Sequence, residues 1–384
     1  MLELHSPYLW KKGQSAKPVR DVMGLRHHGR SEAVTRALSD FGSEDSFGQA
    51  VQRFREHYHY ALSRSTARRV THQVAQAAQA YVEARFAQAT YPEAGEVARE
   101  DRVHDLVVEL DGCKIRTATL EEPDESGPEV GPDEEPPPRR KAVTWREVRM
   151  GLCRPLEATS KTYVGQVAAY PEVVEQIFQA AVLEGMSPET AVTAVADGGI
   201  GLREALDVRF PDLLFILDWK HLKDQLYATA EAIGQPPGER AAWVQPRLDL
   251  IRQGQVQPVM DGLLEESPET RHPRLTQLHG YLTRFADAVD YESFQSYGYP
   301  IGSGEVESSH RSVPQKRLKL PGACWHPDSL APMVALRILR ANGWWDEFWH
   351  HQHQARFGSG SSHAGEQASR EKGYVQPLAS HEGS

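Results

Sequence analysis

HDLVVELDGCKIRTATL, residues 104–120, is the stretch on which the expected fold depends. Its short run of branched apolar residues predicts a strand, with Asp111-Gly112 at the break. Two more strand patterns follow it, KAVTWREVRMGLCRPL at 141–156 and KTYVGQVAAYP at 161–171. Together the three stretches predict a meander of antiparallel strands.

The next patterns alternate between helix and strand. A helix over 172–186 leads to the strand TAVTAVADGG at 190–199, and a helix over 201–211 leads to the strand DLLFILDWKH at 212–221. Three antiparallel strands followed by strand–helix–strand are the order of a ribonuclease-H-like α/β catalytic domain. We expect its first part at 103–218, a helical insertion at 219–298, its final helices at 299–356 and a disordered tail at 357–384.

The amino-terminal third is predicted to be all helical. GRSEAVTRALSDFG at 29–42 has a serine start and a glycine stop, and a further helix follows over 44–60. After the turn ALSRS, where Ser63 or Ser65 can cap, a third helix carries Arg64, Arg68 and Arg69 at its entrance. Three short helices of this kind predict a DNA-binding helix-turn-helix domain at 1–86, joined by a linker at 87–102. The alternative is an ordinary helical bundle with surface arginines.

Charge is unevenly distributed along the 384 residues. The net charge is −10, but residues 121–138 alone carry eight Asp and Glu, six prolines and no basic residue. Residues 1–86 hold 13 Lys and Arg against 8 Asp and Glu. The balance therefore does not exclude a DNA partner. The acidic, proline-rich segment, taken as 121–141, is too poor in apolar residues to pack and predicts a disordered loop.

Composition also points to a compartment. No run of 18 apolar residues is present, so no membrane partner is expected, and the first residues lack the apolar core of a signal peptide. Cys113, Cys153 and Cys324 are widely spaced and fit neither a disulfide framework nor a zinc ribbon. We expect a cytoplasmic, reduced, nucleoid-associated bacterial protein.

Two carboxylates are expected to meet at one edge of the sheet. Asp111 and Asp197 each end a predicted strand and precede glycine. In this layout the first strand runs beside the fourth, and ligands gather at the carboxyl ends of parallel strands. Glu307, on a helix crossing that edge, can complete a cup of three carboxylates. Such a cup suits two Mg²⁺ ions, with Mn²⁺ as the alternative.

The stretch YPIGSGEVESSHRSVPQKRLKLPG, at 299–322, carries that glutamate. Its glycines predict a tight turn through backbone angles closed to other residues. Glu305 competes with Glu307 for the metal role, but we expect Glu307 to hold it and Glu305 to be a solvated neighbour. The basic residues that follow form a cationic track that is expected to hold the DNA backbone: His310, Arg311, Lys316, Arg317 and Lys319. An exposed helical face would give the same pattern. Trp325, after the basic run, is expected to lie in the core; the alternative is that it stacks on a base.

Four ordered motifs carry a resemblance to a known family: VELDGCKIRT, VADGGIGLREAL, ILDWKH and PIGSGEVESSHRSVPQKRLKLPGACW. The chain resembles the DDE transposases of bacterial insertion sequences, most closely the ISKra branch and more distantly the Mutator type, over roughly residues 17–350. The resemblance implies a catalytic triad of Asp111, Asp197 and Glu307. It also implies an accessory motif of Asp218 and His221, which we expect to fix the insertion against the catalytic sheet; the alternative is a fourth ligand and a general base.

The activity implied is metal-dependent cleavage at insertion-sequence ends followed by strand transfer by the freed 3′-hydroxyl. DNA ends and target DNA are the implied partners, with a homo-oligomer assembled on them. Many relatives carry a cysteine-rich amino-terminal zinc segment that this chain lacks, and its acidic loop is not expected of the family. A non-catalytic, transposase-derived DNA-binding regulator and a structure-selective nuclease on the same fold are the alternatives.

Overall fold

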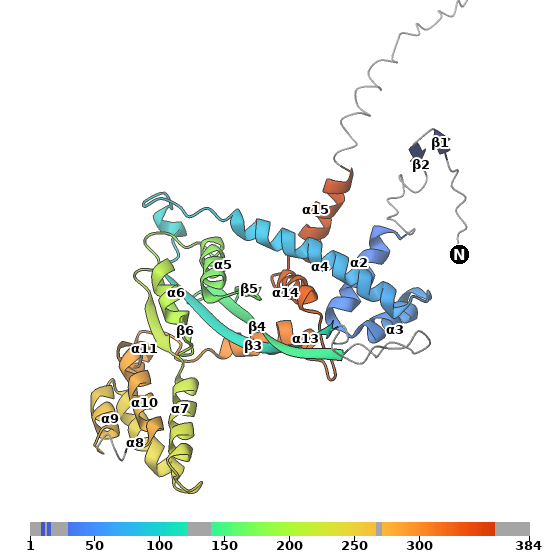
Figure 1. Cartoon of the computed structure of the whole chain (residues 1–384). Coiled ribbons are helices and arrows are strands. Elements are labelled where there is room, and N and C mark those ends of the chain that lie inside the picture. The colour runs from blue at the N-terminus through green and yellow to red at the C-terminus, as the bar shows by residue number, and fades with distance from the viewer. Residues whose placement is uncertain (1–8, 12–13, 17–29, 122–139, 266–270, 358–384) are drawn as a thin grey trace, which may run out of the picture. The chain divides into compact units, whose positions relative to one another are not determined.

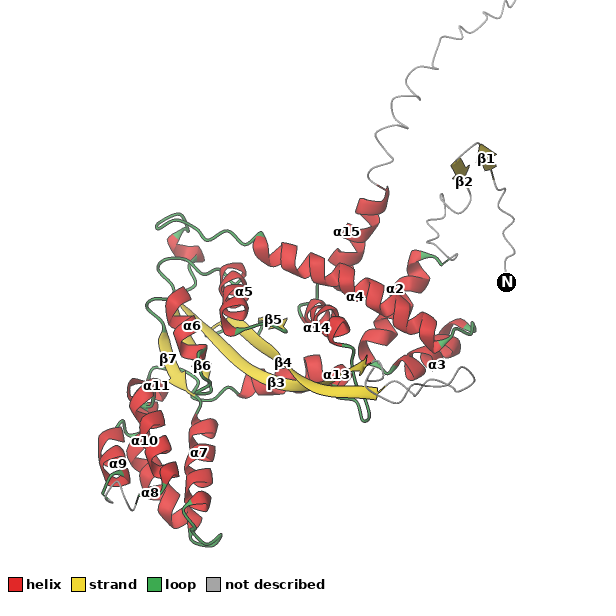
Figure 2. Ribbon diagram, in the orientation of Figure 1, coloured by secondary structure: helices red, strands yellow, loops and turns green. Residues whose placement is uncertain are grey.

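The computed structural model describes residues 9–11, 14–16, 30–121, 140–265 and 271–357 (Figures 1 and 2). The described residues up to Asn342 form one compact unit, and a second begins at Gly343. Most of the predicted acidic loop (122–139) and nearly all of the predicted tail (358–384) lie outside the described residues. The predicted domain boundaries near residues 86, 218 and 298 fall inside the first unit. The division of the chain into separately folding domains at these positions stays a prediction.

The centre of the first unit is a mixed sheet of five strands in the order β5-β4-β3-β6-β7. Its strands are β3 (Asp105–Glu121), β4 (Arg140–Pro155), β5 (Thr162–Gln166), β6 (Ala191–Ala196) and β7 (Leu214–Leu217). β3, β4 and β5 form an antiparallel meander, whereas β6 pairs with β3 and with β7 in parallel. The predicted α/β class is confirmed, and the first strand of the meander lies beside the fourth strand as predicted.

β3 is longer than the sequence pattern suggested. Its antiparallel pairing with β4 continues from Leu106↔Pro155 to Glu121↔Arg140, so the expected break at Asp111-Gly112 is wrong. Only the parallel pairing ends there, because the last pair between β3 and β6 is Leu110↔Ala196. The distal halves of β3 and β4 therefore continue as a two-stranded ribbon beyond the sheet (Figure 2).

Both faces of the sheet are covered by helices. α5 (Tyr170–Leu183) packs on β4 and β5, where a side chain at Gly151 would meet Ile177. On the opposite face, α14 (Pro327–Ala341) packs so closely on β5 that a Cβ at Gly165 would lie 2.9 Å from Ile338. α6 (Leu202–Arg209) connects β6 to β7 and packs beside α5.

The predicted helical insertion is present as a bundle after β7 (Figure 1). Its helices are α7 (Trp219–Ala232), α8 (Arg240–Arg252), α9 (Val256–Leu263), α10 (Pro273–Arg284), the 3₁₀ turn η2 (Ala286–Ala288) and α11 (Tyr291–Ser296). Buried Tyr291 ties the bundle to the sheet, since its hydroxyl donates to the carbonyl oxygen of Leu217 at 2.9 Å.

The amino-terminal helices are α2 (Glu32–Glu44), α3 (Phe47–Tyr58) and α4 (Arg64–Ala87), and they pack around Leu38, Phe54 and Val70. The serine caps were predicted well, because Ser31 caps α2 and Ser63 caps α4. Two details were wrong. α2 runs through Gly42 rather than stopping there, and α4 is a 24-residue helix, not a short one. Its length lets it pack along α14 as well as on α2 and α3.

The chain returns to the sheet through α12 (Gly304–His310), a π-helical turn η3 (Arg311–Gln315), α13 (Lys316–Leu318) and α14. Short elements complete the first unit: β1 (Leu9–Lys11), β2 (Gln14–Ala16) and the 3₁₀ turn η1 (Arg99–Asp101). The second unit is described only by α15 (Trp345–Phe357). No helix within the described ranges is long and apolar enough to cross a membrane.

Candidate active site

Asp111 and Asp197 follow partnered residues on neighbouring parallel strands. Leu110 of β3 pairs with Ala196 of β6, and each aspartate is the next residue along its own strand. One oxygen of each carboxylate accepts a local backbone N–H, from Gly112 at 2.6 Å and from Gly199 at 3.0 Å. The other oxygen of each carboxylate makes neither of these bonds. Because Leu110 and Ala196 are paired, the two carboxylates that follow them lie at the same edge of the sheet.

Burial dominates the local electrostatics of Asp111, and the neighbouring charges add smaller effects. Burial raises the pKa of Asp111, the charge of Asp197 raises it further, and His310 and the Gly112 N–H act in the opposite direction. Burial also raises the pKa of Tyr281, again with help from Asp197. A carboxylate pair of this kind favours a bound cation or a proton between its members.

Close packing fixes the turn after β6. A Cβ at Gly198 would lie 2.3 Å from a ring carbon of Tyr281 and 2.9 Å from the ring of Phe285. Glycine is required there by close approach rather than by an unusual φ, since Gly198 is not among the described residues with positive φ. Tyr281 of the insertion therefore packs against the backbone next to Asp197 and fixes its position.

Glu307 lies on α12, which packs against β3. Its side chain is 30% exposed, and its Oε1 lies 3.4 Å from Nζ of Lys220 at the start of α7. Across the described ranges, no three Asp, Glu, His or Cys side chains lie close enough together to hold a metal ion. The structure thus brings Asp111 and Asp197 together but directs the Glu307 carboxylate toward Lys220.

His310 is a site residue that sequence reasoning placed only in the cationic track. It is buried, and its Nε2 lies 3.6 Å from Oδ2 of Asp111. Burial lowers the pKa of His310, and neither ring nitrogen has a hydrogen-bond partner among the described residues. The available signal was helical spacing, because His310 follows Glu307 by three residues and so lies on a similar face of α12.

Asp218 joins the start of the insertion to the turn before α12. Its Oδ1 accepts the backbone N–H of His221 at 2.8 Å and thereby caps α7. Its Oδ2 accepts both the backbone N–H and the hydroxyl of Ser303, each at 2.6 Å. Burial alone would raise the pKa of Asp218, but the His221 side chain and these hydrogen bonds from Ser303 and the His221 backbone outweigh it and hold the pKa well below its usual range.

His221 lies against the same carboxylate, with Nδ1 3.2 Å from Oδ1 of Asp218. This contact raises the pKa of His221 against the effect of burial, and the charges of Asp197 and Asp111 add to it. These contacts join the first helix of the insertion to the turn before α12. The role of the motif in fixing the insertion against the catalytic sheet stays a prediction, as does the alternative of a fourth ligand and a general base.

The tight turn at 302–304 is not made by special glycine angles. Neither Gly302 nor Gly304 has a positive φ, and a Cβ at Gly304 would meet nothing within 4 Å. That expectation was wrong, because the hydrogen bonds from Ser303 to Asp218 hold the turn instead.

Glu305 and Glu307 have different surroundings. Glu305 accepts both Nε and Nη2 of Arg154, at 3.0 and 2.8 Å, and forms an ion pair with Lys161. It is not the solvated neighbour expected from the sequence, since these bonds fasten α12 to β4 and to the segment before β5. Burial opposes the ionisation of Glu305, but Lys161 and Arg154 outweigh it and lower its pKa.

A second missed residue is Glu109, which lies beneath α12. It is 1% exposed, and its Oε2 accepts the backbone N–H of Val306 at 2.8 Å. Burial raises its pKa to about 7, whereas the Val306 N–H acts in the opposite direction. A polar residue inside the apolar run LVVEL was the signal, because a buried carboxyl is retained only with a partner.

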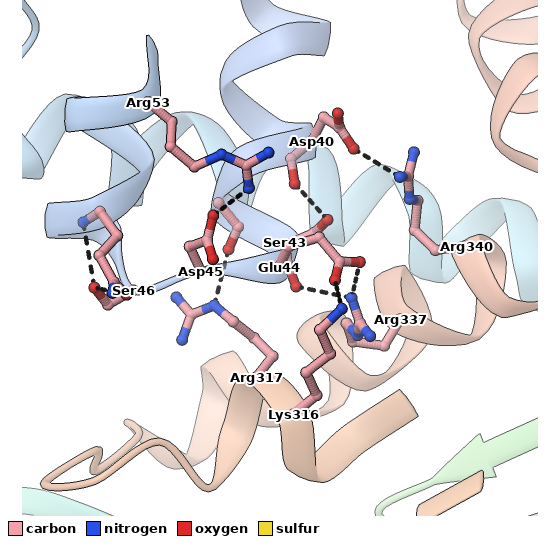
Figure 3. Close-up of polar contacts among 12 residues, drawn as sticks. Asp40, Ser43, Glu44, Asp45, Ser46, Arg53, Lys316, Arg317, Arg337 and Arg340 are labelled. Carbon is pink, nitrogen blue, oxygen red and sulfur yellow. Dashed lines mark hydrogen bonds and ion pairs between the residues drawn. The ribbon is translucent and has the colours of Figure 1, made fainter. Parts of the chain in front are cut away.

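The predicted DNA-contacting side chains fall into two groups. Six of the seven are exposed: Arg64, Arg68, Arg69, Arg311, Lys316 and Lys319. Two of the seven, Lys316 and Arg317, contact α2 (Figure 3). Lys316 pairs with Glu44 at 2.7 Å, with its own side chain 58% exposed, and Arg317 is buried at 3% exposure. The expectation that Arg317 presents its charge at the surface is therefore wrong.

Arg317 and Arg337 both bind the carboxyl end of α2. Arg317 Nε donates to the carbonyl oxygen of Gly42 at 2.9 Å, and Arg337 Nη1 donates to that of Ser43 at 3.1 Å and pairs with Glu44 (Figure 3). The last carbonyls of a helix have no partners within it and carry the negative end of the dipole, so cations suit them. The basic run thus anchors the amino-terminal helices to the segment that follows Glu307.

Comparison with solved structures gives a distant likeness, whereas the two sequence comparisons give none. No protein-family model and no curated protein sequence matches the chain. Among solved structures, the fold is similar to a chain titled Drosophila P element transposase strand transfer complex, with 12% identity and a TM-score of 0.36. The match covers 85% of this chain and 96% of that chain.

Proposed function

We propose that this protein is a DDE-type DNA transposase with a ribonuclease-H-like catalytic core. The observation that carries the proposal is the pairing of β3 with β6. It puts Asp111 and Asp197 directly after partnered residues at one edge of the sheet, with α12 and its Glu307 packed on the same strand. Phosphoryl transfer of this class needs carboxylates at such an edge and no nucleophilic side chain.

The donor chemistry of this edge fits Mg²⁺, or Mn²⁺ in its place. Asp111 and Asp197 offer the oxygen ligands that these ions prefer, and their mutual repulsion raises the pKa of Asp111 alongside burial. Two ions bound there would activate a hydroxyl nucleophile and stabilise the departing 3′ oxygen. We propose Asp111 and Asp197 as ligands, with Glu307 as the third once it leaves Lys220.

The other site residues would act on position and charge. Asp218, through Ser303, sets the start of α12 and therefore the position of Glu307. His310 Nε2 lies 3.6 Å from Oδ2 of Asp111, and because burial lowers the pKa of His310, a neutral ring there would not compete with a cation for the carboxylate. Arg311 and Lys319 are exposed and closely follow Glu307 in the sequence. We propose that they hold phosphates of the DNA being cut.

One observation favours a second candidate, a DNA-binding regulator derived from a transposase. Glu307 pairs with Lys220 at 3.4 Å, and the described residues hold no ready-made three-ligand group. A chain that had lost catalysis would keep such a pairing permanently, whereas an active enzyme would exchange it for metal when DNA binds.

A strand-transfer assay separates these functions. Labelled DNA taken from either side of the coding sequence is incubated with the full chain, target plasmid and Mg²⁺. A transposase joins labelled 3′ ends to the plasmid, and a structure-selective nuclease cuts without joining. A regulator only binds, and that result with both Mg²⁺ and Mn²⁺ would overturn the proposal.

A further inference from the structure

A hollow of about 980 Å³ opens between the first turns of α4 and the loop at residues 320–326. We name it the α4 hollow. α4 lines it with Arg68, Arg69, Gln73 and Gln76, and Trp325 and Cys324 lie on the loop side. A volume of this size is at the upper end of ligand sites, so a lone phosphate would leave most of it empty.

The lining of the α4 hollow is cationic although the chain is acidic. Its charged members are Arg68, Arg69 and Arg317, and no Asp or Glu is among the lining residues. The whole chain has a net charge of −10, so a lining that contains arginines and no carboxylate has the opposite charge to the chain as a whole. Ser65 and Thr66, in the first turn of α4, add the positive end of a 24-residue helix. An anion is the occupant that this lining favours.

Arg317 gives independent evidence of a missing partner. Its Nε is used by Gly42, and its guanidinium carbon lies 4.6 Å from the ring centre of Phe47 and 4.7 Å from that of Trp325. Its Nη2 is buried without a hydrogen-bond partner among the described residues, although Arg317 lines the hollow. Buried donors are rarely left unpaired, so this nitrogen calls for an acceptor supplied from outside.

The same packing excludes recognition of a base by Trp325. The indole is 6% exposed, with Arg317 over one ring and His72 stacked at a centroid distance of 6.3 Å. The expectation that it could stack on a base is not supported by this arrangement. The polar groups that line the hollow are cations, amides and hydroxyls, which are the groups that bind phosphate oxygens of a DNA backbone.

We propose that the α4 hollow binds the phosphodiester backbone of one DNA strand, over a few nucleotides. Arg68 and Arg69 pair with successive phosphates, and Arg317 supplies buried positive charge behind them. The inference rests on the proposed function for its DNA substrate and deepens it. It assigns Arg68 and Arg69, which the sequence placed in a DNA-binding helix-turn-helix, to positioning a DNA strand.

Cys324 allows a direct test on the full chain. It lines the hollow and is partly exposed, whereas Cys113 and Cys153 are buried. We expect a random-sequence duplex to slow alkylation of Cys324 by iodoacetamide severalfold in the wild-type protein. Arg68→Gln with Arg69→Gln should remove that protection at the same DNA concentration. Arg55→Gln with Arg99→Gln is the matched control, because both arginines are exposed and lie outside the lining.

Fluorescence anisotropy adds the salt dependence. Loss of two phosphate contacts should lower the slope of log affinity against log salt by roughly 1.8 on duplex DNA, and affinity by about tenfold or more at 0.1 M salt. The same duplex with a short 3′ overhang identifies the strand. A larger loss on the overhang assigns the hollow to unpaired DNA, and equal losses assign it to duplex backbone.

The outcomes separate this inference from the proposed function. If Cys324 is alkylated equally fast with and without DNA while strand transfer proceeds, the hollow is not a DNA site and the function stands. If DNA protects Cys324 but no transfer occurs, the function fails and the hollow stands. An unchanged salt slope in the Arg68/Arg69 double variant would also overturn the inference.

Discussion

Arg337→Met should be among the most destabilising single changes in the first unit. Arg337 is 5% exposed, and its guanidinium joins α14 to two other segments. It donates to the carbonyl oxygens of Val313 at 2.8 Å, Ser312 at 2.7 Å and Ser43 at 3.1 Å, and it pairs with Glu44. Methionine keeps most of the aliphatic stem, so the change removes donors and charge with little loss of volume.

The size of the effect follows from what is left behind. Removing one partner of a buried ion pair costs about 3–5 kcal/mol, because the other charge stays buried. Glu44 keeps Lys316 at 2.7 Å, which places the ion-pair part near the lower end of that range. Three carbonyl oxygens also lose a charged donor. We expect the free energy of unfolding to fall by about 3–4 kcal/mol.

Urea unfolding followed by circular dichroism measures this, with an unchanged m-value as the condition for comparison. Lys316→Met is the matched control, because it removes a cation from the same Glu44 but from a side chain that is 58% exposed. It should cost no more than about 1 kcal/mol. Combining Arg337→Met with Glu44→Gln should cost less than the sum of the two single changes, by about 1 kcal/mol or more. Equal costs for Arg337→Met and Lys316→Met would refute the assignment of Arg337 as the clamp.

Three further outcomes are expected. Gly198→Ala should lower the free energy of unfolding by about 1–3 kcal/mol and weaken Mn²⁺ binding, since its Cβ would lie 2.3 Å from the Tyr281 ring. Gly304→Ala, the control, should change neither property appreciably. Urea denaturation and Mn²⁺ titration followed by EPR compare the two variants, and equal effects would contradict the packing argument. Asp218→Asn should lower the free energy of unfolding by about 2–3 kcal/mol, because an amide nitrogen would replace an oxygen that now accepts hydrogen bonds. A loss under about 0.5 kcal/mol in the same denaturation assay would contradict this. Burial opposes ionisation of Glu44, but Lys316 and Arg337 outweigh burial and lower the pKa of Glu44. The ionised Glu44 therefore contributes its full stability above about pH 4.3, and this contribution is lost as pH falls through the lower pKa of the folded protein. Glu44→Gln should flatten that part of the stability–pH curve, and an unchanged curve would contradict this assignment.

Local sequence patterns predicted most elements of the sheet and their order. The parallel neighbours β3 and β6 followed from strand–helix–strand topology, and this placed Asp111 beside Asp197 although 86 residues separate them in the sequence. The length of β3 was missed because Asp-Gly is a common turn pair. Its continued pairing with β4 depends on residues 140–149, which lie beyond the acidic segment and give no local signal at Gly112.

Tertiary partners could not be read from the sequence. Lys316 and Arg317 look alike in the basic run, yet one is exposed and the other buried, since only the second meets the carboxyl end of α2. Glu305 and Glu307 also look alike, and their difference depends on Arg154, 151 residues from Glu305 in the sequence. Such long-range pairs follow from packing, whereas sequence periodicity reports only which face of an element is apolar.

The most direct test of the central claim compares four variants in Mg²⁺-dependent cleavage of labelled DNA ends. Asp111→Asn, Asp197→Asn and Glu307→Gln should each reduce cleavage by at least about a hundredfold while DNA affinity and the unfolding midpoint stay near wild type. Glu305→Gln is the matched control, because it removes the neighbouring carboxylate that pairs with Arg154 and Lys161. It should lower stability and leave the cleavage rate of the folded protein within a few-fold of wild type. Full cleavage by Glu307→Gln, together with loss of cleavage in a folded Glu305→Gln variant, would contradict the account.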